Sequence, residues 1–204
     1  MTILTPPDNF LNAPPSVIGV ILAGGQSSRM NTDKAALSIN GVKNLERAVE
    51  LLNNCKLDDV VISGQNYIED HYKNGGPLSG ILSVTQELKS ENQKKAILVI
   101  PIDMPLLTPQ LLNTLIEQGI KHNSACCYYS YNLPIYLPIT EELFNFLNDE
   151  FLSPRFTKHN KGPSFKHLLK YIDCHFINTT NIDLLINANT PEQWNNILKV
   201  ISRQ

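Results

Sequence analysis

A loop with two adjacent glycines holds the side chains in this chain that are best suited to bind phosphate. The apolar run 17–22 leads into Gly24 and Gly25, and the same loop continues to Arg29 and Lys34. Glycines leave backbone N–H groups open to an anion, while a guanidinium and an ammonium add fixed positive charge. The spacing is neither G-x-x-x-x-G-K-[ST] nor G-x-G-x-x-G. A plain turn with two solvated cations is the alternative, but the combination favours phosphate binding.

A lone aspartate is the second feature with chemical potential. Asp103 follows the apolar run 96–100 and stands between Pro101 and Pro105. A carboxylate at the end of a buried strand suits Mg²⁺, which binds one or two protein carboxylates together with substrate phosphates. Asp103 could equally begin the turn before the next helix, and these residues alone support both interpretations.

Two further segments carry groups that a ligand could use. The glycine-rich segment 75–80 leads into a helical pattern, and its glycines permit close backbone approach. Near the C-terminus, Thr190 and Pro191 are typical of a helix N-cap and first turn. This local role does not explain the two amides just before them, Asn187 and Asn189.

The elements that must position these residues alternate between apolar runs and helical patterns. Strands are predicted over 17–22, 59–63, 96–100, 124–129 and 175–177. Helices are predicted over 45–52, 81–88, 109–116, 141–151, 168–172 and 191–202. This order predicts an α/β fold with a mostly parallel sheet covered on both faces, in which ligands bind beyond the strand C-termini. Both the glycine loop and Asp103 follow such a terminus.

Length and composition restrict the domain organisation and the class of partner. The 204 residues fit one domain, predicted over 16–204, after a Pro- and Asn-rich segment, 1–15, that we expect to be a flexible tail. A net charge of -2 argues against a general binder of nucleic acid or of a membrane surface. No signal-peptide pattern or membrane-length apolar run is present, and the four cysteines show no C-x-x-C spacing. We therefore expect a cytoplasmic protein.

Four strings, taken in order, resemble the MobA family of molybdenum cofactor guanylyltransferases. They are LAGGQSSRMNTDK, GPLSGI, IPIDMPLLTP and NANTPEQW. The resemblance implies a Rossmann-like, three-layer nucleotidyltransferase fold. It also implies Mg²⁺-dependent transfer of GMP from GTP to Mo-molybdopterin, giving the guanine dinucleotide cofactor and pyrophosphate. Molybdoenzyme chaperones or other cofactor-biosynthesis proteins are the protein partners that it suggests.

The resemblance also assigns roles to residues of this chain by their position in the family motifs. Arg29, Lys34 and Asp103 are the catalytic candidates, and Asp103 is the metal ligand. The expected nucleotide-site residues are Leu22, Ala23, Gly24, Gly25, Lys34, Ser63, Asp70, Gly76, Gly80, Asp103, Asn187 and Asn189.

Two alternatives stay open at this stage. Ser63 stands where the family has an asparagine that faces the guanosine, so a related transferase that uses CTP or another phosphorylated acceptor is one alternative. The other is a non-catalytic, pterin-binding homologue with a degenerate site. Stabilisation by GTP against CTP separates the first, and retention of Lys34 and Asp103 argues against the second.

Overall fold

The computed structural model describes residues 14–24, 34–88, 95–159 and 162–201. Two predicted site residues, Gly25 and Arg29, lie outside this part of the chain, as does most of segment 1–15. The strands are β1 (Ser16–Leu22), β2 (Ser38–Ile39), β3 (Val42–Lys43), β4 (Asp59–Ser63), β5 (Lys95–Pro101), β6 (Ala125–Tyr128), β7 (Ile135–Pro138) and β8 (Cys174–Ile177). The helices are α1 (Asn44–Asn53), α2 (Pro77–Leu88), α3 (Pro109–His122), α4 (Glu141–Leu152), α5 (Pro154–His159), α6 (Phe165–Tyr171), the 3₁₀ helix η2 (Ile182–Leu185) and α7 (Pro191–Ile201).

A six-stranded sheet in the order β4-β1-β5-β7-β6-β8 forms the middle of the molecule. β7 runs antiparallel to its neighbours β5 and β6, whereas the pairs β1–β4, β1–β5 and β6–β8 are parallel. The predicted mostly parallel sheet is therefore confirmed. The wholly apolar strands β1 and β5 lie inside it, as expected for strands covered on both faces.

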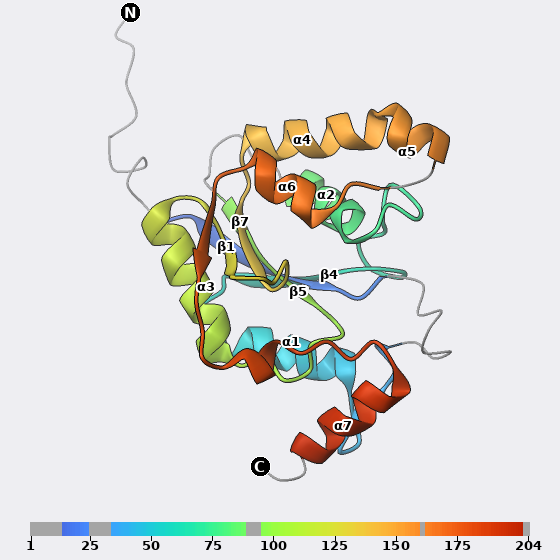
Figure 1. The fold of residues 1–204 in the computed structure, drawn as a ribbon, viewed down its shortest axis with the longest axis vertical. Helices are drawn as coiled ribbons and strands as arrows, with labels where there is room; N and C mark the ends of the chain where they lie inside the picture. Colours follow the sequence, from blue (N-terminus) through green and yellow to red (C-terminus); the bar gives the residue numbers. More distant parts are fainter. Residues whose placement is uncertain (1–13, 25–33, 89–94, 160–161, 202–204) are drawn as a thin grey trace, which may run out of the picture.

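Helices cover the two faces of the sheet and complete a three-layer α/β arrangement, as Figure 1 shows. α2, α4, α5 and α6 lie over one face, where they pack on the side of β1 that carries Val20. α1 and α3 lie over the other face, on the side that carries Ile21. α7 packs beyond α1 through Trp194, against Ile39 and Leu106. Among the described helices, none has the length and apolar character needed to cross a bilayer.

The structure contains elements that the sequence patterns did not predict. β7 is a four-residue strand whose Ile135 and Leu137 are fully buried. Pro134 precedes it and Pro138 ends it, and prolines ordinarily indicate that a strand is interrupted. The short hairpin β2–β3 and helix α5 were also not predicted, because each is too short to show a period.

The strand register brings three loops to one edge of the sheet. Leu22, the last residue of β1, is paired with Ser63 of β4 and with Pro101 of β5. The segments that follow these strands therefore begin side by side, and they include Gly24, Asp70 and Asp103. At the end of this edge α3 begins with Thr108 as N-cap and a proline in the first turn, as predicted.

Candidate active site

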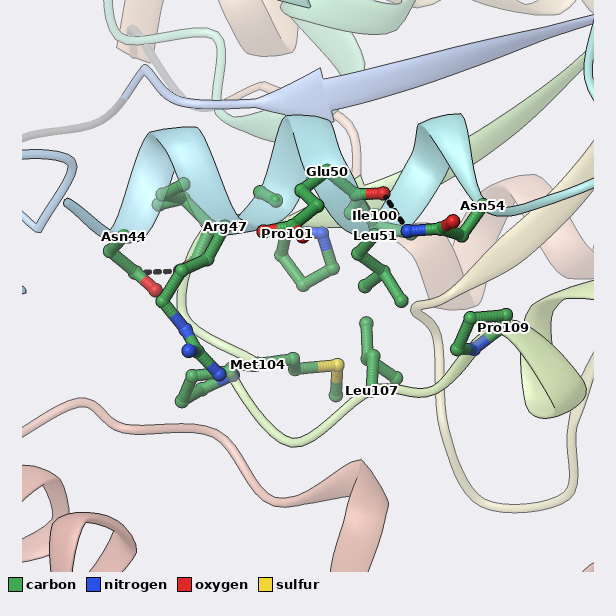
Figure 2. A pocket seen from close by; sticks show the side chains of 13 residues that line it. Asn44, Arg47, Glu50, Leu51, Asn54, Ile100, Pro101, Met104, Leu107 and Pro109 are labelled. Atoms are coloured by element: carbon green, nitrogen blue, oxygen red, sulfur yellow. Dashed lines mark hydrogen bonds between the residues drawn. The ribbon is translucent and has the colours of Figure 1, made fainter. Parts of the chain in front are cut away.

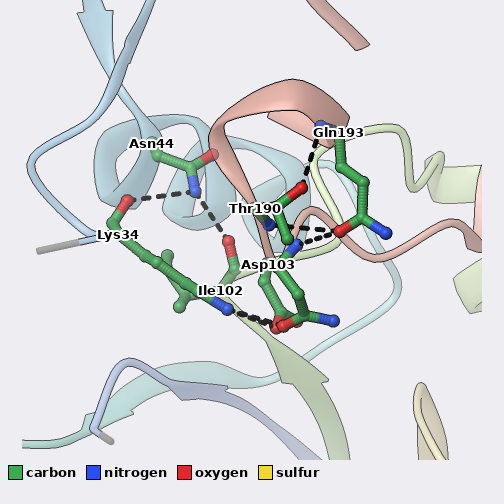
Figure 3. Close-up of polar contacts among 7 residues, drawn as sticks. Lys34, Asn44, Ile102, Asp103, Thr190 and Gln193 are labelled. Atoms are coloured by element: carbon green, nitrogen blue, oxygen red, sulfur yellow. Dashed lines mark hydrogen bonds and ion pairs between the residues drawn. The ribbon is translucent and has the colours of Figure 1, made fainter. Parts of the chain in front are cut away.

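Lys34 and Asp103 meet beyond the C-terminal ends of β1 and β5, although they are far apart in sequence. Lys34 Nζ lies 2.9 Å from Asp103 Oδ2 and donates a second hydrogen bond to Asn189 Oδ1 at 2.8 Å (Figure 3). The side chains of Lys34 and Asp103 are 17% and 16% exposed, so the ion pair is largely shielded from water. The predicted convergence of these two residues is confirmed.

The second carboxylate oxygen of Asp103 has no partner among the described residues. Asp103 Oδ1 is buried and accepts no hydrogen bond, although Oδ2 is paired with Lys34. A buried anionic oxygen without a partner is costly, and a cation would satisfy it. Within the described ranges no group of three or more His, Cys, Asp or Glu residues gathers to hold a metal. The residues present therefore fit a hard ion that takes one protein carboxylate and completes its shell with substrate oxygens and water.

Asn44 connects the backbone segments that carry the ion pair. It is 2% exposed at the start of α1, and its Nδ2 donates to Ile102 O at 2.6 Å and to Lys34 O at 3.4 Å (Figure 3). One amide thus links the main chain of Lys34 to that of the residue before Asp103. Sequence reasoning missed Asn44, since the only signal was a polar residue at the start of a helix whose burial the pattern could not show.

The segment that carries Asn187 and Asn189 is held against the Asp103 turn. Ala188 N donates to Asp103 O at 2.7 Å. Gln193 Oε1 accepts from the backbone N–H groups of Asn189 and Thr190, while Gln193 N donates to Thr190 Oγ1 (Figure 3). Reciprocal bonds of this kind form a capping box, for which T-x-x-Q is the sequence signature. That signature could have identified Gln193, whose role was not predicted.

A cavity of about 240 Å³ opens beside the ion pair. Its lining combines the end of β1, the start of the glycine loop, the Asp103 turn and the C-terminal amide segment: Leu22, Ala23, Gly24, Lys34, Pro77, Pro101, Ile102, Asp103, Leu133 and Asn187. Six predicted site residues, Leu22, Ala23, Gly24, Lys34, Asp103 and Asn187, are therefore brought to one cavity. Pro77 and Leu133 were not predicted, because apolar residues carry no chemical signature.

The glycine loop differs from expectation in the direction of its first amides. Ala23 N and Gly24 N both donate to Ser63 O, at 2.9 and 3.2 Å. These bonds extend the parallel ladder between β1 and β4 past the end of the strands. The expectation that the Gly24 amide points at an anion is therefore wrong in this structure, although Gly24 itself lines the cavity.

Ser63 and Asp70 form a second polar pair, and both Gly24 and Gly80 lie close to it. Ser63 is 1% exposed and its hydroxyl donates to Asp70 Oδ1 at 3.3 Å. A Cβ on Gly80 would collide with Ser63 Oγ and lie 3.2 Å from Asp70 Oδ1, while one on Gly24 would lie 3.9 Å from Asp70 Oδ2. Burial raises the pKa of Asp70, and the Ser63 hydrogen bond partly offsets this. Ser63, Asp70 and Gly80 are not among the residues that line the cavity.

Of the remaining predicted residues, Gly76 and Asn189 lie in the described part of the chain, and Gly25 and Arg29 do not. Gly76 has a φ of +71° in the turn before α2, next to Pro77 of the cavity wall, and a side chain there would be strained. Asn189 reaches the ion pair through its side chain, without lining the cavity. Gly25 and Arg29 lie outside the described residues, so their predicted roles remain predictions.

Comparison with known sequences points to one family. Residues 19–144 match the MobA-like NTP transferase domain. A molybdenum cofactor guanylyltransferase of Xanthomonas euvesicatoria pv. vesicatoria (strain 85-10) is 31% identical over 186 residues, which cover 88% of this chain and 93% of that protein. A probable molybdenum cofactor guanylyltransferase of Bacillus cereus (strain B4264) is 26% identical, over 91% of this chain and 98% of its own length.

Comparison with solved structures supports the same fold. The molybdopterin-guanine dinucleotide biosynthesis protein A of Archaeoglobus fulgidus superposes with a TM-score of 0.70 at 18% identity, covering 92% of this chain and all of that chain (100%). A cytidylyltransferase of Leptospira borgpetersenii serovar Hardjo-bovis (strain JB197) superposes with a TM-score of 0.66 at 13% identity, over 95% of this chain and 88% of that one. At these identities the likeness concerns the fold, which is the Rossmann-like arrangement of nucleotidyltransferases.

Proposed function

This chain belongs to the family of MobA-like NTP transferase domains and is a nucleotidyltransferase, and from this premise we propose that it transfers GMP from GTP to Mo-molybdopterin. The products are the molybdopterin guanine dinucleotide cofactor and pyrophosphate. The names of the curated relatives, which are molybdenum cofactor guanylyltransferases, support this choice of substrates. We place the reaction in the cytoplasm, and proteins of cofactor biosynthesis or molybdoenzyme chaperones are the partners to which it would pass its product.

The observation that carries the proposal is the Lys34–Asp103 pair beside the cavity at the C-terminal edge of β1 and β5. A lysine 2.9 Å from an aspartate whose other oxygen is buried and unpaired is a poor device for stability alone. It suits a site in which a metal-bound triphosphate supplies the missing charges. A degenerate, non-catalytic site would have no need to keep these groups.

The chemistry requires positioning and charge more than it requires a base. The terminal phosphate of the pterin is already an anion at neutral pH, so it attacks the α-phosphorus of GTP without losing a proton, and pyrophosphate leaves. Lys34 binds the triphosphate through its ammonium, and Asn189 holds that ammonium in place. Arg29, on the loop that follows Gly24, is proposed to add a second cation. The walls of the cavity would orient the triphosphate for this attack.

Asp103 is the residue proposed to hold Mg²⁺, through the carboxylate oxygen that has no protein partner. When bound there, Mg²⁺ would neutralise charge on the phosphate oxygens. Asn44 and Ala188 keep the Asp103 turn in place from two sides, through Ile102 O and Asp103 O. Asp70, Ser63 and Gly80 lie close to Gly24 and are proposed to support the nucleoside, together with Asn187 of the cavity wall.

The test is pyrophosphate release from each of the four nucleoside triphosphates, with molybdopterin and Mg²⁺ present. GTP is expected to be the substrate turned over fastest, and omission of Mg²⁺ should abolish release. Thermal unfolding with GTP or CTP gives an independent reading, because a ligand at 100 times its Kd adds about 2.7 kcal/mol to the free energy of unfolding. Preference for CTP would replace the guanylyl assignment with a cytidylyl one. If no triphosphate reacts or stabilises the chain, the proposed function is wrong.

A further inference from the structure

A second cavity, of about 230 Å³, lies between α1 and the chain that joins β5 to α3 (Figure 2). One wall is a face of α1 and the other is the turn that continues from Asp103. The lining residues are Asn44, Arg47, Ala48, Glu50, Leu51, Asn54, Ile100, Pro101, Ile102, Met104, Pro105, Leu107 and Pro109. The catalytic scheme above uses none of the polar side chains that α1 presents here except Asn44.

Arg47 has a buried polar atom in this cavity without a partner. Its Nε is buried and has no hydrogen-bond acceptor among the described residues, and no ion pair joins it to Glu50. Figure 2 shows Arg47 extending from α1 toward Met104 along one side of the cavity. A guanidinium is always charged, and a buried N–H without an acceptor costs free energy. The terminal N–H groups of Arg47 lie beside the cavity near Met104 (Figure 2), and these are the groups that a planar anionic ligand would reach.

The other lining groups limit the charge and shape of such a ligand. Arg47 and Glu50 are the cation and the anion among the lining residues, so the cavity offers one positive charge and a neighbouring negative one. That balance suits a monoanion better than a phosphate dianion, which needs several donors and cations. Leu51, Met104 and Leu107 provide an apolar surface for a hydrocarbon body (Figure 2).

The cavity lies directly behind the catalytic turn. Pro101 and Ile102 line both cavities, so an occupant of the second one contacts the back of the turn that presents Asp103. Asn44, on the wall of the second cavity, donates to Lys34 O and Ile102 O. Contact with this wall therefore reaches the backbone on both sides of the Lys34–Asp103 pair.

We propose that this cavity is an effector site for a small organic monocarboxylate with an aromatic or branched apolar body. The carboxylate pairs with Arg47 and the body packs on Leu51, Met104 and Leu107. Occupancy shifts the affinity of the catalytic cavity for nucleotide through the shared turn, and this coupling rests on the function proposed above. The binding itself does not depend on that function.

The direct test is titration with benzoate, followed by ligand-observed NMR, on the full chain. For a ligand of this size we expect a Kd on the order of 1 mM. Arg47→Ala should weaken binding about tenfold or more, and Arg47→Lys should fall between, because it keeps the charge but loses the planar fork. Arg155→Ala, which removes an exposed arginine from α5, is the matched control and should bind as the native chain does. Inorganic phosphate, as a comparison probe, should not compete.

A variant that is expected to bind benzoate more tightly guards against a loss of binding caused by misfolding. Glu50→Gln removes the negative charge near the carboxylate and should tighten benzoate binding by about twofold to threefold. Coupling is measured as a change in the Kd for Mg²⁺–GTP when benzoate is present, in the native chain but not in Arg47→Ala. Equal benzoate affinity in the native and Arg47→Ala chains, or competition by phosphate, would overturn the site. Binding without a change in GTP affinity would overturn the effector role, while failure to bind GTP would count against the proposed function alone.

Discussion

Lys34 holds two acceptors at once, and each of them comes from a different part of the chain. Asp103 and Asn189 are 69 and 155 residues away from it in sequence. In the absence of substrate the ammonium compensates the Asp103 carboxylate, and with a triphosphate present the same ammonium can pair with phosphate oxygens. The residue is therefore expected to matter for nucleotide affinity more than for stability.

Lys34→Ala should weaken GTP binding by roughly 1.5–3 kcal/mol, the size of one hydrogen bond to a charged group. Isothermal titration calorimetry with Mg²⁺–GTP measures this. Lys56→Ala is the matched control, because Lys56 forms an ion pair with Glu117 at 2.7 Å but both side chains are well exposed, at 70% and 57%. An unchanged GTP affinity in Lys34→Ala would remove this residue from the site.

Asp103→Asn should reduce pyrophosphate release on the order of 100-fold or more while the fold persists. Asparagine has nearly the same shape, so packing is retained, but the negative charge that pairs with Lys34 and is proposed to hold Mg²⁺ is gone. Turnover at saturating Mg²⁺ measures the loss, and circular dichroism checks the fold. Near-normal turnover in this variant would discard the metal assignment.

Asp70 is expected to lower stability at neutral pH, since burial raises the pKa of its carboxyl in the folded state. The folded chain then binds the proton more readily than the unfolded chain, so this contribution to stability improves as pH falls through the folded-state pKa. Asp70→Asn should therefore be more stable than the native chain at pH 7, with the difference shrinking toward about pH 4. Urea unfolding across this range measures it, with the exposed Asp149→Asn on α4 as control. A difference that grows on acidification would contradict the prediction.

At the scale of elements, the side chain of Asn44 forms a hydrogen bond from α1 to the residue before Asp103, in addition to the apolar packing of the two segments. Asn44→Ala leaves Ile102 O without its donor in a buried place, which costs about 1–3 kcal/mol in the free energy of unfolding. Denaturant unfolding measures the loss. Asn53→Ala, on an exposed position of the same helix, should change stability by no more than about 0.5 kcal/mol. Equal effects of the two substitutions would show that the Asn44 hydrogen bonds contribute nothing.

At the scale of the whole molecule, residues 16–204 are predicted to unfold as one unit. The two main core clusters lie on opposite faces of the same sheet, and both include residues of β1 and β5. Each helical layer therefore depends on the shared strands for its core. α7 packs beyond α1, and it carries the one tryptophan of the chain, Trp194. Urea transitions followed by Trp194 fluorescence and by far-UV circular dichroism should coincide. Two separate midpoints would show that α7 and its hairpin contacts form an independent unit.

The sequence by itself determined the features that depend on short-range chemistry. Apolar runs such as 17–22 and 96–100 form strands because they are short and rich in Val and Ile, and a sheet covered on both faces buries every one of their side chains. Thr108 and Pro109 begin α3 because the cap and the fixed φ act within one turn of helix. Asp103 could be placed at a strand end for the same reason, because it lies two residues after the end of β5. Lys34 lies twelve residues after the end of β1, and its role was assigned from its position in the family motif.

Only the tertiary structure decided which of these groups lie together and which hydrogen-bond partners they have. Asn44 became a link between Lys34 and Ile102 because α1 packs against the end of β5, a contact that no local spacing encodes. β7 formed between prolines because two buried neighbours supplied its hydrogen bonds. The Gly24 amide was taken by Ser63 O because the parallel ladder continued beyond the strand. Hydrogen-bond partners and burial depend on the packing of distant segments, so they follow from the fold and not from the pattern along the chain.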